Sequence, residues 1–256
     1  MPDIFLSHNP QFNPLSEVVS LCRLYKSGIE MAAFSDIAVV NDVAQATIHQ
    51  AAVCGVAGRS VHAPYLGLYP GSPEAEVRKA TLACFKDVYR IAVRLSAAHI
   101  IFHHNYDPSM CSESEWLENS CAFWREYLKG KTSGVKIHLE NIMDSTPALL
   151  SELVRRIDSP LLDIALDIGH AHAYSKVMPE GWVESLKGQI GYVHLHDNHG
   201  LEDEHLALGE GNILLKETLE ALCSHAQCAV WTIESGGDRM LRSIEWLKCN
   251  CYLEDL

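Results

Sequence analysis

Short apolar segments alternate with longer amphipathic segments along the whole chain. Each apolar segment has about the length of a β-strand and is rich in β-branched or aromatic residues. Eight of these segments are predicted to form strands: residues 3–8, 28–34, 59–65, 99–104, 135–141, 161–167, 190–197 and 228–235.

The stretch from 73 to 98 illustrates what lies between the strands. Its apolar positions recur at helical spacing, namely at Val77, Leu82, Phe85, Val88, Tyr89 and Ala92. The tripeptide Ser72-Pro73-Glu74 is typical of a helix start, with Ser72 as the cap and Pro73 in the first turn. The pattern therefore predicts a long helix after the third strand.

Strands that alternate with helices in this way predict an α/β fold, a single (β/α)8 TIM barrel. The chain has 256 residues, and such barrels typically have about 250. An open doubly wound sheet is the alternative, but its GxGxxG fingerprint is absent. Without a linker, low-complexity tract or short repeat, residues 1–256 are interpreted as one domain. Its active site is expected at the C-terminal ends of the strands.

Composition and charge narrow the class of partner. The apolar content of 48% fits a folded protein. Lys and Arg number 20 against 33 Asp and Glu, which gives a formal net charge of −13. An acidic chain without a dense basic run repels nucleic acid. This counts against a DNA substrate without excluding it, because bound divalent metals would cancel part of the charge.

Three features of the sequence predict a cytoplasmic location. Nine Cys are scattered without a CxxC pair, which predicts reduced thiols. The opening MPDIFLSHNP lacks a basic segment followed by an apolar core, so no signal peptide is expected. No apolar run approaches the ~20 residues that span a bilayer, so no membrane association is expected.

Polar residues recur where the predicted strands end. They are His62, His103, Glu140, Asp167, His194 and Glu234. In a barrel these ends meet at one mouth, and three carboxylates with three imidazoles there require a counter-charge. A divalent metal is the simplest one, since His with Asp or Glu suits Zn, Mn or Fe.

Spacing adds further candidates. If a helix follows the sixth strand directly, Asp167 and His170 lie on one side of it. His194 and His196 share one strand face, and only the one nearer the mouth is needed as a ligand. Asp197 is a candidate to orient a neighbour, and His172 is assigned to the surface or to a supporting position. The remaining histidines are interpreted as structural or surface residues: His8, His49, His99, His138, His199 and His225.

Seven motifs together carry a resemblance to a known family: VHAPY (61–65), IFHH (101–104), HLEN (138–141), ALDIGHAHA (165–173), VHLHDN (193–198), EDEHLALGEGN (202–212) and TIES (232–235). The chain resembles the xylose isomerase-like TIM barrel superfamily, and within it the endonuclease IV (AP endonuclease 2) family. The strongest match is DxHxxLGEGN with DxxHA before it.

The resemblance implies nine metal ligands and two or three zinc ions, with Mn, Fe or Co as alternatives. His62, His103 and Glu140 would hold the first metal. Glu140 would bridge to a second, completed by Asp167, His194 and Glu234. His170, Asp203 and His205 would hold the third. Tyr65 matches a residue beside the substrate, and His196 is the other substrate-binding candidate.

Two metals can clamp a phosphodiester and supply hydroxide at neutral pH. The sequence therefore favours a metal-dependent phosphoester hydrolase, with Glu140 and Glu234 as catalytic carboxylates. The N-terminal segment IFLSHNPQFNP (4–14) differs from the Gly-x-His-x-Ser motif of the endonucleases. A small phosphorylated metabolite, such as the nucleotide loop of a cobamide, is therefore the expected substrate, ahead of abasic DNA. The alternative is a sugar isomerase or epimerase with one metal. Such enzymes need only the residues matching Glu140, Asp167, His194 and Glu234.

Overall fold

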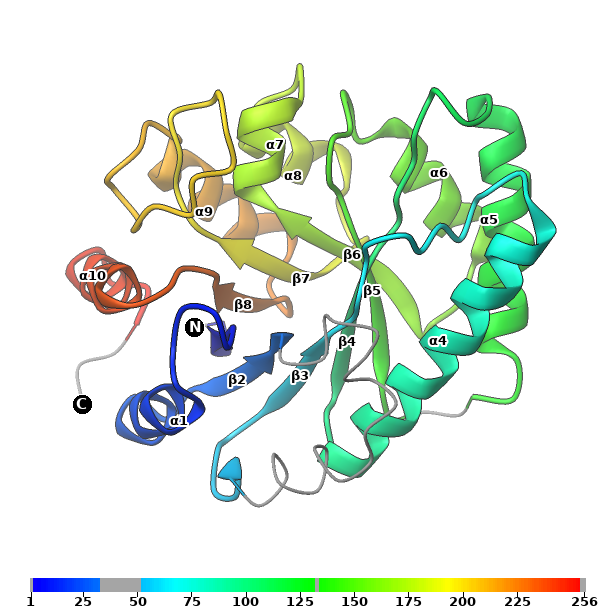
Figure 1. Ribbon diagram of the computed structural model, residues 1–256. Helices are drawn as coiled ribbons and strands as arrows, with labels where there is room; N and C mark the ends of the chain where they lie inside the picture. The colour runs from blue at the N-terminus through cyan, green and yellow to red at the C-terminus, as the bar shows by residue number, and fades with distance from the viewer. Residues whose placement is uncertain (1, 33–51, 132–133, 254–256) are drawn as a thin grey trace.

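The computed structural model describes residues 2–32, 52–131 and 134–253. Eight strands form a closed barrel in which each is parallel to its neighbours (Figure 1). Their bounds are β1 Ile4–His8, β2 Gly28–Met31, β3 Arg59–His62, β4 His99–His103, β5 Lys136–Glu140, β6 Leu162–Asp167, β7 Ile190–Leu195 and β8 Val230–Ile233. Each predicted strand is confirmed in place, and the barrel closes through pairing of β1 with β8.

Helices follow the strands around the outside of the barrel (Figure 1). In the described part of the chain they are α1 Leu15–Leu24, α4 Ala75–Leu95, α5 Glu113–Leu128, α6 Ala148–Ile157, α7 Ile168–Tyr174, α8 Pro179–Ser185, α9 Leu215–His225 and α10 Asp238–Cys249. The fold is thus the predicted single (β/α)8 barrel. The end of the predicted strand 28–34, from residue 33, and the predicted surface residue His49 lie outside the described residues.

The predicted start of the long helix is wrong by two residues. Helix α4 begins at Ala75, and its N-cap is Glu74, whose side chain makes no capping bond. The Ser72 hydroxyl instead accepts a hydrogen bond from the Glu74 backbone N–H at 3.1 Å. The helix cannot begin earlier because the Glu74 backbone is extended, with φ −81° and ψ 115°. Ser72 therefore forms a turn before the helix.

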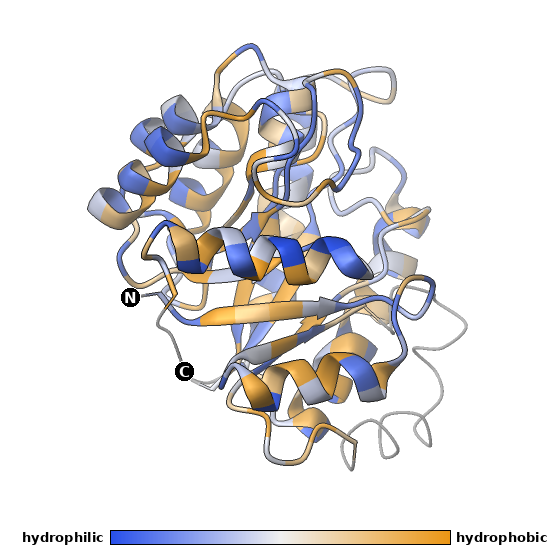
Figure 2. Cartoon of the chain, turned by 90° about the vertical axis from the view of Figure 1, so that its left-hand side faces the viewer, coloured by the Kyte–Doolittle hydropathy of each residue, from blue (hydrophilic) through white to orange (hydrophobic). Residues whose placement is uncertain are grey.

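Apolar side chains fill the space between the barrel and its helices. Phe85 of α4 is 1% exposed and packs against Phe102 of β4 and Trp124 of α5, with ring centroids 4.2 and 5.8 Å away. Figure 2 shows hydrophobic and hydrophilic residues side by side along the outer helices, as expected where one face packs inward. Among the described helices, none has the length and apolar character needed to cross a membrane. All nine cysteines are free thiols.

Candidate metal centre at the barrel mouth

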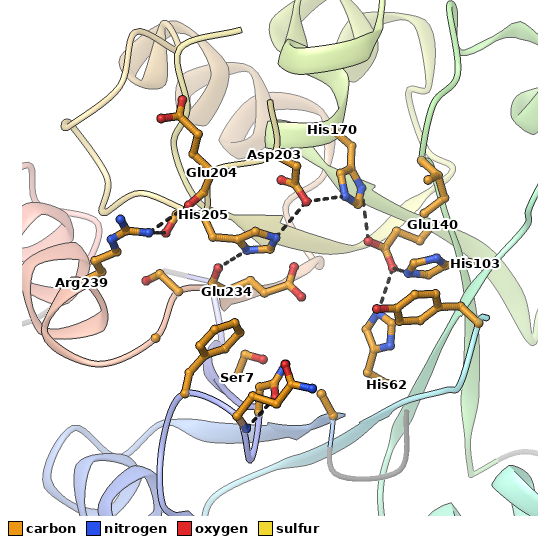
Figure 3. A pocket seen from close by; sticks show the side chains of 18 of the residues that line it. Ser7, His62, His103, Glu140, His170, Asp203, Glu204, His205, Glu234 and Arg239 are labelled. Carbon is orange, nitrogen blue, oxygen red and sulfur yellow. Dashed lines mark hydrogen bonds and ion pairs between the residues drawn. The ribbon is translucent and has the colours of Figure 1, made fainter. Parts of the chain in front are cut away.

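The C-terminal ends of the strands carry the predicted site residues. His62, His103, Glu140 and Asp167 are the last residues of β3 to β6, His194 is next to last in β7, and Glu234 directly follows β8. Parallel pairing places His103 beside Glu140 and Asp167 beside His194. A cavity of about 1040 Å³ opens at this end of the barrel (Figure 3). The convergence that was inferred from strand ends alone is therefore present.

Glu140 lies at the centre of the cluster and is 1% exposed. Its Oε2 is 3.1 Å from His62 Nε2 and 3.3 Å from His103 Nε2. Its Oε1 is 3.2 Å from His194 Nδ1. One carboxylate oxygen thus faces the pair His62 and His103, and the other faces a second group that contains His194. This is the geometry of a bridging ligand.

The second of these groups combines Glu140, Asp167, His194 and Glu234, whose donor atoms all lie within 4.8 Å of one another. His194 Nδ1 is 3.1 Å from Glu234 Oε2 and 3.7 Å from Asp167 Oδ2. Three carboxylates and one imidazole in a buried site form a donor set that suits a divalent cation. The residues present therefore fit a metal ion.

Backbone contacts hold several of the imidazoles in a single orientation. The Nδ1–H groups of His62, His170 and His205 donate to the carbonyls of Ala63, Asn141 and Glu234, at 3.0, 2.9 and 2.7 Å. Each thereby turns its Nε2 atom toward a carboxylate. This arrangement is typical of metal-ligating histidines, whose second nitrogen is fixed by a hydrogen bond.

The loop from 202 to 212 contributes Asp203, Glu204 and His205 to the lining of the cavity. Asp203 Oδ2 lies 3.0 Å from His205 Nε2 and 3.3 Å from His170 Nε2, so all three predicted residues of the third set meet (Figure 3). Asp197 fixes the base of this loop, because its carboxylate accepts from the N–H groups of Asn198, Gly209 and Ile213. The neighbour that Asp197 orients is therefore the loop that carries Asp203 and His205.

The predicted relation between Asp167 and His170 is confirmed. Asp167 is the N-cap of α7, and its side chain accepts from the His170 backbone N–H at 2.7 Å. Asn141 ties this helix start to β5, because its side chain exchanges two hydrogen bonds with the Asp167 backbone. Asn141 was not singled out from the sequence, although it directly follows a strand-end carboxylate.

Charges within the cluster shift one another's pKa values. Burial favours the neutral form of Glu140, but His194 and His103 hold its pKa well below its usual range. Burial raises the pKa of Glu234. Burial opposes the charge on His62 and His205, but Glu140 and Asp203 respectively raise each pKa to about 9. Burial lowers the pKa of His103 to about 4.

The two candidate substrate-binding residues differ in position. Tyr65 lines the cavity, and its ring stacks on His103 with centroids 4.3 Å apart. His196 is fully buried beneath the mouth, and its Nε2 lies 3.1 Å from Asp167 Oδ1. Its ring stacks on His205 at 4.1 Å, and it forms a further group of close donor atoms with His205 and Glu234.

Several histidines assigned to structural roles have partners away from the mouth. His138 Nδ1 bonds Asp163, and its Nε2 accepts from His99 Nδ1 at 2.9 Å. His199 pairs with Glu204 at the surface. His172, assigned to the surface or to support, donates to Asn198 Oδ1 at 2.7 Å. His8 is buried and His225 is in the last turn of α9.

Sequence reasoning missed one buried carboxylate that touches the cluster. Glu30 of β2 is fully buried, and its Oε2 lies 3.1 Å from His194 Nε2. A signal was present, since a glutamate interrupts the apolar segment GIEM. It was overlooked because Glu30 is not at the end of its strand.

Comparison with known proteins agrees with this architecture. Residues 30–249 match the AP endonuclease 2 family, described as xylose isomerase-like TIM barrel. The uncharacterised protein MJ1311 of Methanocaldococcus jannaschii is 38% identical over 201 residues, which cover 73% of this chain and 68% of that protein. A solved D-tagatose 3-epimerase-like protein is 29% identical, with a TM-score of 0.79 and 98% of each chain covered.

A second solved structure, the TTHB071 protein from Thermus thermophilus soaked with ZnCl2, is 24% identical with a TM-score of 0.76. The match covers 96% of this chain and 97% of that chain. A likeness at this level of identity shows the fold. Barrel topology, strand-end residues and the match over most of the sequence lead to one conclusion: the chain belongs to the xylose isomerase-like TIM barrel family.

Proposed function

We propose that the chain is a metal-dependent isomerase or epimerase of a small sugar. The observation that carries this proposal is the four-residue group Glu140, Asp167, His194 and Glu234 at the base of the cavity. The sequence alone favours hydrolysis over this alternative. Similarity to a D-tagatose 3-epimerase-like protein across 98% of both chains supports the isomerase class.

The placement of the two glutamates supports a role in moving a carbon-bound proton. Glu140 and Glu234 come from β5 and β8, and their carboxylates point into the same space (Figure 3). A divalent metal in the four-residue group, such as Zn, Mn, Fe or Co, would polarise the oxygens of a hydroxy-ketone. One glutamate then removes the proton from the carbon next to the carbonyl, and the other returns a proton. The substrate gains and loses one proton, without net oxidation.

Incubation of the metal-loaded protein with a panel of ketoses in D₂O tests this function. Wild-type protein is expected to exchange the hydrogen next to the carbonyl, seen as loss of one proton NMR signal, and to form an isomer. With metal supplied in enough excess to keep the variant loaded, Glu234→Gln should slow this exchange by ~10²–10⁴-fold, the usual contribution of a general acid or base. Absence of exchange on every ketose, in protein shown to contain metal, would contradict the proposal.

Hydrolysis of a small phosphodiester is the second candidate. It is favoured by the additional group His62, His103 and Glu140, which shares Glu140 with the first group. Two metals held ~3.5–4 Å apart can clamp a phosphodiester between them. A chromogenic diester tests this candidate: turnover that requires His103, with ketoses left unchanged, would replace the isomerase proposal by the hydrolase.

An abasic DNA substrate is the least supported of the three. Arg239 and Arg242 are the arginines that line the cavity, and both are already engaged. Arg239 donates to the carbonyls of Glu204 and His205, and Arg242 pairs with Glu210. Phosphate backbones need several free cations, so we infer a small-molecule substrate.

A further inference from the structure

Glu30 is a carboxylate inside the barrel that the proposed reaction does not use. It is the third residue of β2 and is 0% exposed. Parallel pairing places it beside Ser7 of β1 and Ser60 of β3. Across the interior its Oε2 reaches His194 Nε2 at 3.1 Å, and His194 is also 0% exposed. Burial favours the neutral form of Glu30, but His194 lowers its pKa below the usual value.

The partner of His194 differs from the partners of the other ordered imidazoles. His62, His170 and His205 each donate one ring N–H to a backbone carbonyl. His194 instead faces the side chain of Glu30, which comes from a strand far from β7 in the sequence. A carboxylate partner makes an imidazole a stronger ligand than a neutral carbonyl does. His194 is also the only imidazole of the four-residue group.

The contact also decides which ring nitrogen faces the cluster. With its Nε2–H donated to Glu30, His194 presents Nδ1 to the carboxylates of Glu140, Glu234 and Asp167, at 3.2, 3.1 and 3.7 Å. Rotation of the ring about its Cβ–Cγ bond would break the Glu30 contact, which is enclosed on all sides. Glu30 therefore holds both the tautomer and the orientation of the ring.

We propose that Glu30 is the positioning residue of the metal centre, which holds His194 Nδ1 toward the ion and raises its strength as a ligand. This inference rests on the metal binding in the proposed function but not on the identity of the substrate. It predicts that Glu30 controls metal affinity without contact to the ion or to a sugar.

A purely structural role for Glu30 is the competing explanation, and the barrel provides a matched control. Asp163 of β6 bonds His138 Nδ1, a second carboxylate–imidazole pair in the barrel wall. His138 is 1% exposed, and its Nε2 faces His99 instead of the cluster. Asp163→Asn therefore removes an equivalent charge from a histidine that does not contact the candidate ligands.

The test measures Zn²⁺ and Mn²⁺ affinity by competition with a chromophoric chelator, in wild type, Glu30→Ala, Glu30→Gln and Asp163→Asn. Thermal unfolding of each metal-free protein is followed in parallel. Glu30→Ala is expected to weaken one class of metal site by ~10–100-fold, the usual effect of losing a partner of a ligating histidine. Glu30→Gln keeps an acceptor oxygen without the charge, so its metal affinity should fall by a smaller factor. This variant replaces Glu30→Ala in the test if the alanine variant does not fold.

Asp163→Asn should keep wild-type metal affinity even if its unfolding temperature falls. The proposal is overturned if folded Glu30 variants bind metal as tightly as wild type, or if Asp163→Asn weakens binding to the same extent. A wild-type protein that binds no metal would overturn the metal centre itself. Normal metal binding without any ketose exchange would reject the proposed function but leave the role of Glu30 standing.

Discussion

Replacement of Glu140 by Gln tests whether one carboxylate serves two metal groups. Gln has the same size, so no cavity forms, but only one of its two terminal side-chain atoms can accept. In the structure Oε2 serves His62 and His103 at 3.1 and 3.3 Å, and Oε1 lies 3.2 Å from His194 Nδ1. The amide oxygen can face only one side, and the amide nitrogen then faces the other. The group that the nitrogen faces loses its ligand, and the group that the oxygen faces keeps an oxygen without the negative charge, so both metal groups should weaken but to different extents.

The magnitude follows from the role of Glu140 as a ligand of both groups. Loss of a hydrogen-bond partner of a ligand costs ~10–100-fold in metal affinity. Loss of the ligand itself should exceed this upper value, about 100-fold or 2.8 kcal/mol, at the group that the amide nitrogen faces, with a smaller loss at the other. Two matched variants separate the groups: Glu234→Gln changes the four-residue group and leaves the group of His62, His103 and Glu140 intact, and His103→Ala changes only the latter.

The assay is titration of the metal-free proteins with Zn²⁺ against a chelator, with circular dichroism to confirm folding. Wild type should show two classes of site, each single-group control should lose one, and Glu140→Gln should weaken both. A Glu140→Gln protein in which one class keeps wild-type affinity would refute the bridging role of this carboxylate.

Three further predictions concern the fold around the site. Burial lowers the pKa of His99 to about 3, from a usual value near 6.5. The unfolded chain therefore binds the proton more readily, and the stability contributed by neutral His99 is lost as the pH falls from about 6.5 toward 3. Urea unfolding of wild type and His99→Gln at pH 7.5 and 5 should show a smaller loss in the variant, and an equal loss would contradict this. Phe85→Ala should cost about 3–5 kcal/mol, measured by denaturant unfolding, and a cost below about 1 kcal/mol would mean that the aromatic cluster repacks. Gly169→Ala places a Cβ 1.9 Å from the Cε1 atom of His196, so it should lower both the unfolding temperature and metal affinity, and an unchanged protein would show that the ring has room to move.

The barrel was predictable because its signals are local and repeated. Eight apolar segments of strand length, separated by amphipathic stretches, leave few other arrangements at 256 residues. The mouth residues were predictable for the same reason, since carboxylates and imidazoles at strand ends must meet once the barrel closes. The start of α4 was not, because Pro73 and the Ser72 hydroxyl form a turn that resembles a capped helix start.

What the sequence could not supply is contact across the barrel interior. Glu30 and His194 are far apart in the chain, and their meeting depends on the closure of β1 onto β8. The sharing of Glu140 between two groups depends on side-chain orientation, and only the family resemblance, not the spacing of residues, implied it. The sequence also favoured hydrolysis, because it carries His62, His103, Asp203 and His205 in addition to the four-residue group. The similarity to an epimerase-like structure instead supports the four-residue group as the reaction centre.

Metal content per chain, measured by elemental analysis of protein purified without added metal or chelator, tests the central claim most directly. The account predicts at least one equivalent of a divalent transition metal in wild type. It also predicts that His194→Ala loses one equivalent, because that change removes the only imidazole of the four-residue group. A folded wild-type protein that contains no such metal, and takes up none when Zn²⁺ or Mn²⁺ is supplied, would contradict the account.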